Sequence, residues 1–358
     1  MDVLDSKPLI TTVIPTYRRP LMLRRAIRSV LNQTFPDFRL CIYDNASGDE
    51  TGAVVEEFRK KDSRVEYFCR PENIGMSMNF ADGAKRVETP FFSFLPDDDL
   101  MLPHFFETAL SGFQRHPEAA LSILPTLCMS PRGRILLVTN LQWPEGLLLP
   151  PGGMLSTLRY GNPGLQAMLI RADVWKKING FDEDTVPIEE LDFDLHVMAH
   201  RPVFVSRQPG AIQVMHGGSF TMNAGLEWVW TIPRIIAKVQ NMDLPPSVKH
   251  EATERLSKWL KRGLVMRGGF RSISDGRWAE ARKAADFLEQ EFQLRRVAQM
   301  IRGTAVICRS LPGTRFFLRF PVALTAYLKA IRNLRLQWRL RGYAKLLSTV
   351  VESAQNHV

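Results

Sequence analysis

The chain has 358 residues, of which 45% are hydrophobic and 23% are charged, as in an ordinary folded protein of one large domain or two. No stretch reaches the ~18 apolar residues of a membrane-spanning helix. Residues 1–8 lack the basic and apolar regions of a secretory signal peptide. This composition excludes a disordered chain and a transmembrane protein as interpretations of the sequence.

The four cysteines are widely spaced and form no CxxC pair. They are Cys41, Cys69, Cys128 and Cys308. This pattern predicts buried thiols in a reducing compartment, so we expect a cytoplasmic protein.

The net charge of +10 is unevenly distributed along the chain. Residues 251–358 contain 21 Lys and Arg against 8 Asp and Glu, whereas the rest contains 26 against 29. The basic character therefore belongs to the C-terminal third, which we expect to face an anionic surface or partner.

The first hundred residues alternate between two hydrophobic patterns. Short β-branched or aromatic runs at 9–14, 38–43, 65–68 and 91–95 predict strands. Helical spacing follows the first three, at 20–32, 50–61 and 76–87. This alternation predicts a mostly parallel, doubly wound sheet with right-handed crossovers.

Carboxylates follow two of these strands. Asp97, Asp98 and Asp99 come directly after the fourth, and adjacent carboxylates repel one another unless a cation lies among them. At the carboxyl end of a central strand this pattern favours a divalent cation that carries a phosphorylated substrate. The alternative is a solvated turn that caps a helix at Pro103.

Asp44 ends the second predicted strand and can accept an N–H from a base such as uracil. The alternative is an Asx-turn residue in a loop that contains Gly48. The sequence has neither GxGxxG nor a P-loop motif, and neither GxSxG nor HExxH.

The remainder of the first region is less regular. A helix is expected to about residue 115, and strands at 119–124, 165–170, 203–205 and 211–215. Residues 130–163 are rich in Gly and Pro and predict a long loop of the kind that forms an acceptor pocket or lid.

Several short motifs occur together in a characteristic order. They are TVIPTYRR at 12–19, SVLNQT at 29–34, DNASGD at 44–49, NIG at 73–75, DDD at 97–99 and GFDE at 180–183. Over residues 9–220 this set resembles the family 2 glycosyltransferases of the GT-A fold. The resemblance implies an α/β fold with a mostly parallel, Rossmann-like sheet flanked by helices. We expect a catalytic domain at 1–225, followed by a largely helical basic region at 226–358.

The resemblance also implies which residues bind the donor nucleotide. Asp44 is similar to the family carboxylate that reads the base, and the tip of the first strand lies beside it. The expected nucleotide-binding residues are Pro15, Thr16, Tyr17, Asp44, Asn73, Gly75, Asp97 and Asp98.

The Asp triplet resembles the family's metal-binding DxD motif, which holds Mn²⁺ or Mg²⁺ on the donor diphosphate. Counting back from Pro103, the matching pair is Asp98 and Asp99, whereas the triplet itself gives Asp97 and Asp99. We favour Asp99 as a metal ligand and Asp98 for the ribose or the metal. His216 is similar to a family histidine that touches the metal or the diphosphate.

The family's catalytic base comes from an acidic pair at a helix start. Aligned on the Asp194–Leu195 dipeptide, the base is Asp192, with Leu191 in place of the usual Glu and Glu190 as the reserve. The alternative is that these carboxylates only complement a helix N-terminus.

The C-terminal third shows helical spacing at 228–239, 248–265 and 278–292, with an interruption at 303–313. From Val322 to Arg341 a basic amphipathic pattern with aromatic residues fits a helix at a membrane surface. The alternative is a helix that packs on its own domain. No nucleic-acid motif accompanies the charge, so we expect no nucleic-acid partner.

The leading hypothesis is an inverting transferase that uses a UDP- or dTDP-sugar and a glycan or lipid-linked acceptor, peripheral on the inner face of the cell membrane. A sugar nucleotidyltransferase would need a basic Gly-rich loop, of which only Arg18 and Arg19 are present. A non-catalytic scaffold of the same fold would tolerate neutralisation of the Asp triplet and Asp192.

Overall fold

The computed structural model describes residues 8–216, 226–311, 313, 314 and 318. These residues fall into two compact units, one of residues 8–216 and one that begins at residue 226, and each is described by itself. The basic amphipathic segment expected at 322–341 lies outside the described residues.

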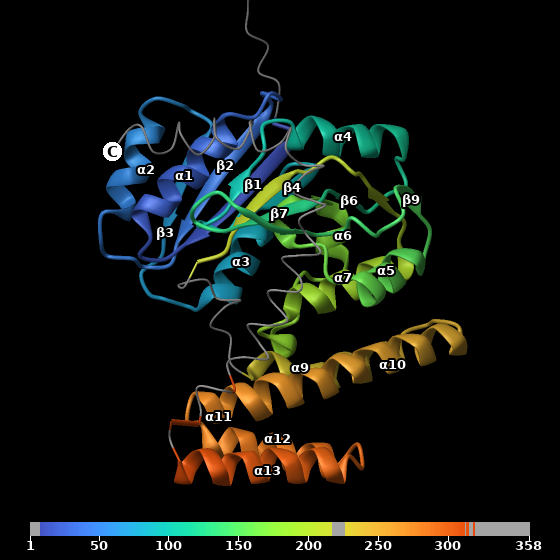
Figure 1. Ribbon diagram of the computed structural model, residues 1–358. Helices are drawn as coiled ribbons and strands as arrows, with labels where there is room; N and C mark the ends of the chain where they lie inside the picture. The colour runs from blue at the N-terminus through green and yellow to red at the C-terminus, as the bar shows by residue number, and fades with distance from the viewer. Residues whose placement is uncertain (1–7, 217–225, 312, 315–317, 319–358) are drawn as a thin grey trace, which may run out of the picture. The chain divides into compact units, whose positions relative to one another are not determined.

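The first unit begins with four strands that alternate with three helices (Figure 1). The strands are β1 (Ile10–Thr16), β2 (Phe38–Asp44), β3 (Val65–Cys69) and β4 (Phe91–Phe94), and the helices are α1 (Pro20–Leu31), α2 (Thr51–Arg59) and α3 (Met76–Lys85). All four strands are parallel, in the order β3-β2-β1-β4. The predicted parallel arrangement is confirmed.

The rest of the first unit completes this sheet and builds a second one. Its strands are β5 (Leu100–Met101), β6 (Leu121–Ile123), β7 (Thr126–Met129), β8 (Ile135–Val138), β9 (Gly146–Leu148), β10 (Met168–Arg171), β11 (Val203–Val205) and β12 (Ala211–Val214). Its helices are α4 (Phe105–Arg115), α5 (Gly152–Tyr160), α6 (Ala172–Lys177) and α7 (Glu189–His200), with short 3-10 turns η1 (Leu165–Ala167) and η2 (Glu183–Thr185).

The large sheet has eight strands in the order β3-β2-β1-β4-β10-β6-β11-β9. β10 runs antiparallel to both β4 and β6, and β9 runs antiparallel to β11. The carboxyl ends of β1, β2 and β4 therefore meet at one edge, where doubly wound folds bind ligands.

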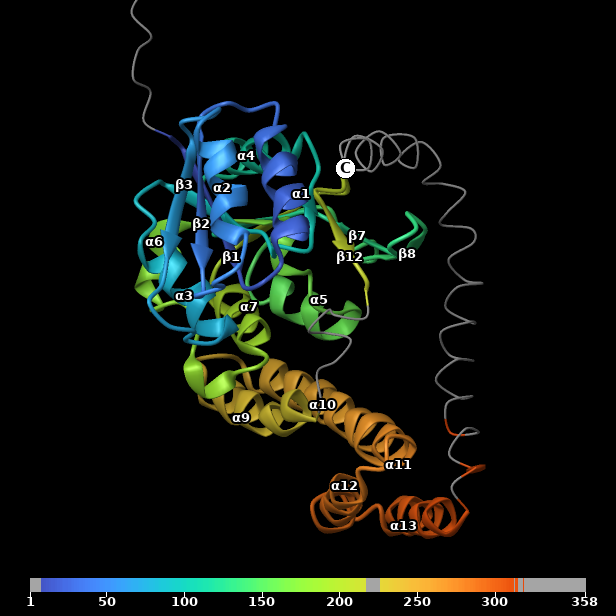
Figure 2. The same ribbon diagram turned by 90° about the vertical axis from the view of Figure 1, so that its left-hand side faces the viewer.

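Helices cover both faces of the large sheet (Figures 1 and 2). On one face Ile10, Ile14 and Leu40 share a buried core with α1, α2 and α4. On the other, Val13 and Tyr43 pack under Gly83 of α3. Burial of this apolar surface on both faces is the main stabilising contribution to the fold.

Aromatic residues fix α7 beneath the second face. Phe193 of α7 packs against Trp175 and Phe181, and Trp175 also contacts Phe94 of β4. Because α7 begins at Glu189, this packing holds its acidic first turn under the carboxyl edge of the sheet.

The expected loop at 130–163 is wrong in part. β8, β9 and α5 lie within it, and β9 is the edge strand of the large sheet. Their hydrophobic runs are only three or four residues long, so the surrounding Gly and Pro residues concealed them.

The second unit is helical. It contains α9 (Glu227–Asn241), α10 (Pro246–Gly263), the π-helix η3 (Leu264–Arg271), α11 (Ser272–Ser274), α12 (Trp278–Gln290) and α13 (Arg295–Ser310). The interruption expected from residue 303 is wrong, because α13 continues through Gly303 and ends at Ser310. Among the helices that the structure describes, none combines the length and hydropathy needed to cross a membrane.

Candidate active site

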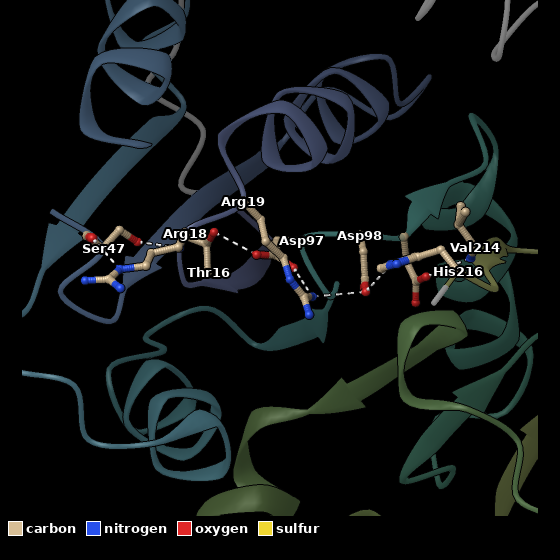
Figure 3. Close-up of polar contacts among 9 residues, drawn as sticks. Thr16, Arg18, Arg19, Ser47, Asp97, Asp98, Val214 and His216 are labelled. Carbon is tan, nitrogen blue, oxygen red and sulfur yellow. Dashed lines mark hydrogen bonds and ion pairs between the residues drawn. The ribbon is translucent and has the colours of Figure 1, made fainter. Parts of the chain in front are cut away.

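Each of the three aspartates after β4 has a hydrogen-bond partner of its own, and Figure 3 shows those of Asp97 and Asp98. Asp97 accepts a hydrogen bond from the Thr16 hydroxyl at the tip of β1, at 2.8 Å. Asp98 Oδ2 lies 3.0 Å from His216 Nε2. Asp99 accepts a hydrogen bond from the Val214 backbone N–H at 3.0 Å.

The second sheet brings these distant residues together. β12 pairs antiparallel with β5, so that Ala211 lies opposite Met101 and Ile212 opposite Leu100. Continuing in this direction, the end of β12 runs back past the Asp triplet. His216, 118 residues away in sequence, therefore reaches Asp98.

Arg19 provides a positive charge for two of the carboxylates. Its guanidinium NH1 lies 3.1 Å from Asp97 Oδ1 and 3.1 Å from Asp98 Oδ2. Burial raises the pKa of Asp97 to about 6, an effect that Arg19 and the Thr16 hydroxyl oppose. Burial also raises the pKa of Asp99 well above its ordinary value, and the charge of Asp98 adds to this.

The side chains of Asp98 and His216 are of the types that coordinate divalent cations. A carboxylate oxygen and an imidazole nitrogen lie 3.0 Å apart, and both side chains are only partly buried. Within residues 8–216 and the described part of the helical unit, no group of three or more His, Cys, Asp or Glu could hold a metal. A cation here would need oxygens from the ligand and water to complete its coordination.

Asp44 lies in a polar pocket at the end of β2. Its Oδ2 accepts a hydrogen bond from the Tyr67 hydroxyl at 2.6 Å, and its Oδ1 accepts one from the Ser47 backbone N–H at 2.9 Å. The Cys69 thiol lies 3.9 Å from the same Oδ2. These contacts fix the carboxylate, and Oδ1 has a further lone pair for a ligand's N–H.

Asn45 ties the loop at 73–75 to the end of β2. Its amide Nδ2 donates to Asn73 Oδ1 at 2.9 Å and to the Gly75 carbonyl at 3.1 Å. Gly75 has a φ of +86° where α3 begins, a conformation that favours glycine. Asn73 and Gly75 therefore lie near Asp44 through Asn45.

The tip of β1 contributes three expected site residues with different exposure. Pro15 and Thr16 are buried, and Tyr17 is 38% exposed. The guanidinium of Arg18 lies over the Tyr17 ring, and its Nε donates to the Ser47 carbonyl at 3.0 Å. The two arginines therefore point toward different partners (Figure 3).

The first turn of α7 carries the candidate bases. Asp192 is buried at 4% exposure, and Glu190 is partly exposed. Burial raises the pKa of Glu190 to about 7, and the charge of Glu189 adds to this. The charge of Glu190 in turn raises the pKa of Asp99, so Glu190 lies toward the Asp triplet.

Several polar residues of this region were not predicted as site residues: Arg18, Arg19, Asn45, Ser47 and Tyr67. Tyr67 could not be predicted because it reaches Asp44 only through the β2–β3 register, which pairs Cys69 with Asp44. Cys69 itself is exposed, so the expectation of buried thiols is wrong for it and confirmed for Cys41, Cys128 and Cys308.

Comparison with known proteins finds a family match within the first unit. The family model described as glycosyl transferase family 2 matches residues 11–148, which contain β1–β9, Asp44 and the Asp triplet. These residues are similar to glycosyl transferase family 2. The resemblance inferred from the motifs is confirmed.

Curated relatives of this family match parts of the chain. A GalNAc(5)-diNAcBac-PP-undecaprenol β-1,3-glucosyltransferase of Campylobacter jejuni is 33% identical over 104 residues, which are 29% of this chain and 34% of the relative. A validoxylamine A glucosyltransferase of Streptomyces hygroscopicus is 27% identical over 240 residues, 58% of this chain and 56% of the relative. The chain thus spans between about a third and just over half of the length of these two relatives.

The fold extends beyond the matched residues. S. aureus TarS 1–349 superimposes with a TM-score of 0.61 at 16% identity, covering 92% of this chain and 91% of TarS 1–349. The same protein solved with UDP-GlcNAc gives a TM-score of 0.60 at 17% identity. The GT-A fold predicted from the sequence is confirmed.

Proposed function

We propose that this protein is an inverting glycosyltransferase that moves a sugar from a UDP- or dTDP-sugar to an acceptor hydroxyl. The observation that carries the proposal is the placement of Asp98 and His216 beside one another, at the same edge of the sheet as Asp44. A nucleotide needs one group for its base and another for its diphosphate, and we assign Asp44 to the first and the Asp98–His216 pair to the second.

We assign recognition of the donor's uracil or thymine base to Asp44. Uracil and thymine present the same ring N–H, which a carboxylate can accept. Tyr67 and Ser47 hold the two oxygens of Asp44 in place, so this carboxylate is already oriented before the nucleotide sugar binds. We also assign the nucleotide to Pro15, Thr16, Tyr17, Asn73 and Gly75. Thr16 lies opposite Asp44 in the β1–β2 register, and Asn45 ties Asn73 and Gly75 to the end of β2.

The diphosphate is assigned to the Asp98–His216 pair, with Mn²⁺ or Mg²⁺ as the cofactor. When bound, the cation would neutralise the charge that develops on the leaving diphosphate. Asp98 and His216 would hold it, and Asp97 would orient the loop through Thr16. Asp99 was favoured as a metal ligand from the motif. Because it is 3% exposed and accepts the Val214 N–H, we propose instead that it supports this loop.

The reaction needs a base on the other side of the anomeric carbon. The acceptor oxygen forms its bond to this carbon while the bond to the diphosphate oxygen breaks, and the electron pair leaves with the diphosphate. A carboxylate in the first turn of α7 takes the hydroxyl proton. Asp192 carries this role by resemblance, and Glu190 is the alternative, because its charge acts on Asp99.

The acceptor is assigned to the class of glycans or lipid-linked glycans. The name of the C. jejuni relative describes an enzyme that acts on a polyprenyl-diphosphate glycan. In the helical unit of this chain, α13 leaves Met300, Val306 and Ile307 exposed, and the residues from 251 onward are strongly basic. These features support a cytoplasmic enzyme at an anionic membrane surface.

The test is a product analysis by NMR with a panel of UDP- and dTDP-sugars and a short glycan acceptor, with Mn²⁺ present. The proposal expects transfer from one donor with inversion at the anomeric carbon. Asp192→Asn should lower kcat by at least about a hundredfold and leave donor affinity unchanged. If Glu190→Gln has this effect and Asp192→Asn does not, the base is Glu190. Retention of configuration would contradict the proposed mechanism.

A further inference from the structure

One atom of the candidate site carries two positively polarised partners. Asp98 Oδ2 lies 3.1 Å from Arg19 NH1 and 3.0 Å from His216 Nε2. This oxygen belongs to the carboxylate assigned to the cation under the proposed function. A divalent cation bound at this oxygen would lie close to the guanidinium, and repulsion between the two positive charges would weaken its binding.

Of the groups in this contact, Arg19 has the most freedom to move. Its side chain is 34% exposed, whereas the side chains of Asp97 and Asp98 are 6% and 12% exposed. Arg19 precedes α1 as its N-cap residue and has a long side chain that can turn into solvent. The carboxylates are fixed by Thr16 and His216, so an exchange of partners must move the guanidinium.

The charges determine when this exchange is favourable. Without a ligand, movement of Arg19 into solvent would leave the carboxylates of Asp97 and Asp98 without a counter-ion. This is unfavourable because the two side chains have low exposure. An arriving diphosphate offers the guanidinium a new anionic partner with the forked geometry that arginine prefers. The cation can then take the place of Arg19 on Asp98, and the total charge of the site remains nearly balanced.

We propose that Arg19 is the resident counter-ion of Asp97 and Asp98 in the empty site and is exchanged for the divalent cation when the nucleotide diphosphate binds. This inference rests on the proposed function, because it needs a diphosphate ligand. Its consequence is that cation and nucleotide bind cooperatively, each strengthening the other by the same factor. Arg19 is thus a positioning residue that suppresses binding of the cation alone.

The experiment measures Mn²⁺ binding by titration calorimetry, and by the EPR signal of free Mn²⁺, with and without UDP. In the wild type we expect Mn²⁺ alone to bind weakly and UDP to strengthen it about tenfold or more. In Arg19→Gln, Mn²⁺ alone should bind about tenfold more tightly than in the wild type, and the strengthening by UDP should nearly vanish. Simple structural damage would weaken Mn²⁺ binding instead.

Two further variants keep the result interpretable. Arg64→Gln removes a guanidinium–carboxylate pair with Asp62 elsewhere in the unit and should leave Mn²⁺ binding unchanged. Arg19→Lys retains a positive charge and should keep Mn²⁺ alone weakly bound, even if Arg19→Gln does not fold. If Arg19→Lys and Arg19→Gln both bound Mn²⁺ alone more tightly than the wild type and to the same extent, the effect could not come from the charge of Arg19.

The failures of the two proposals can be told apart. If neither UDP nor dTDP binds the wild type with Mn²⁺ present, the proposed donor site is wrong. If a nucleotide binds but Arg19→Gln has the Mn²⁺ affinity and coupling factor of the wild type, the donor site stands and the exchange of Arg19 is overturned.

Discussion

Tyr67 donates a hydrogen bond of 2.6 Å to Asp44, from the neighbouring strand of the sheet. The phenol lies on the same carboxylate oxygen as the Cys69 thiol, whereas the other oxygen is held by the Ser47 backbone N–H. The carboxylate assigned to the nucleotide base is therefore fixed from two sides, and its surroundings can be tested without any knowledge of the sugar or the acceptor.

Removal of the Tyr67 hydroxyl should loosen Asp44. In Tyr67→Phe we expect the Kd of UDP to rise about 3- to 10-fold, because a hydrogen bond to a charged acceptor is lost. Titration calorimetry measures this change. Tyr160→Phe, at an exposed tyrosine of α5, is the matched control and should bind UDP as the wild type does. Equal affinities in Tyr67→Phe and the wild type would mean that Asp44 needs no support from Tyr67.

Cys69 provides a chemical probe of the same pocket. It is the exposed cysteine among the four, so it should react with a maleimide in the folded protein while Cys41, Cys128 and Cys308 do not. UDP with Mn²⁺ should slow this reaction at least about fivefold, because the base would cover the thiol. Mass spectrometry of the labelled peptides measures both results. Undiminished labelling at saturating UDP would place the base elsewhere.

Gly83 marks the closest approach of α3 to the sheet. A Cβ at this position would lie 2.6 Å from Val13 Cγ1 and 3.0 Å from Tyr43 Cδ2. Gly83→Ala should therefore lower the free energy of unfolding by about 1–3 kcal/mol. Gly152→Ala in α5 is the control, since its Cβ would make an ordinary contact of 3.8 Å with Leu148. Urea denaturation compares the two variants, and equal stabilities would show that α3 can shift without cost.

Glu190 should make stability depend on pH. Burial and the charge of Glu189 favour the protonated form, with a pKa of about 7. The unfolded chain releases this proton near pH 4.5, so its stabilising effect is complete below that pH and is lost as the pH rises to about 7. Between about pH 5 and pH 7.5, the Tm of the wild type should fall more steeply than the Tm of Glu190→Gln. Parallel Tm profiles would contradict this placement of Glu190.

Much of the fold could be predicted from the sequence, because each of the first four strands is a short hydrophobic run followed by a polar turn. Asp44 and the Asp triplet could be predicted directly, because they stand at the ends of two of these strands. β8 and β9 could not be predicted, since their short runs lie among Gly and Pro residues and gain stability only from neighbouring strands. Gly303 was expected to interrupt a helix, but α13 packs along α12 and tolerates it.

The candidate site was predicted less completely. The approach of His216 to Asp98 depends on the antiparallel pairing of β12 with β5, which no local spacing reveals. His216 was therefore identified through family resemblance alone. Arg19 follows the end of β1, but its partners follow the end of β4, so only the tertiary structure assigns it to Asp97 and Asp98.

The different environments of Asp98 and Asp99 separate a role in binding from a role in stability. Asp98 contacts Arg19 and His216, whereas Asp99 is buried and accepts the Val214 N–H. In Asp98→Ala the affinity for UDP with Mn²⁺ should fall at least about tenfold at a nearly unchanged Tm. In Asp99→Ala the loss should appear mainly in stability, by about 1–3 kcal/mol, since a buried hydrogen bond is broken.

The most direct test of the donor site is the affinity of UDP and dTDP measured by titration calorimetry with Mn²⁺ and with a chelator, in the wild type and in Asp98→Ala. The proposed function predicts that one of these nucleotides binds the wild type at least about tenfold more tightly with Mn²⁺, and that Asp98→Ala loses this difference. Absence of binding for both nucleotides, or an Mn²⁺ effect that persists in Asp98→Ala, would contradict it.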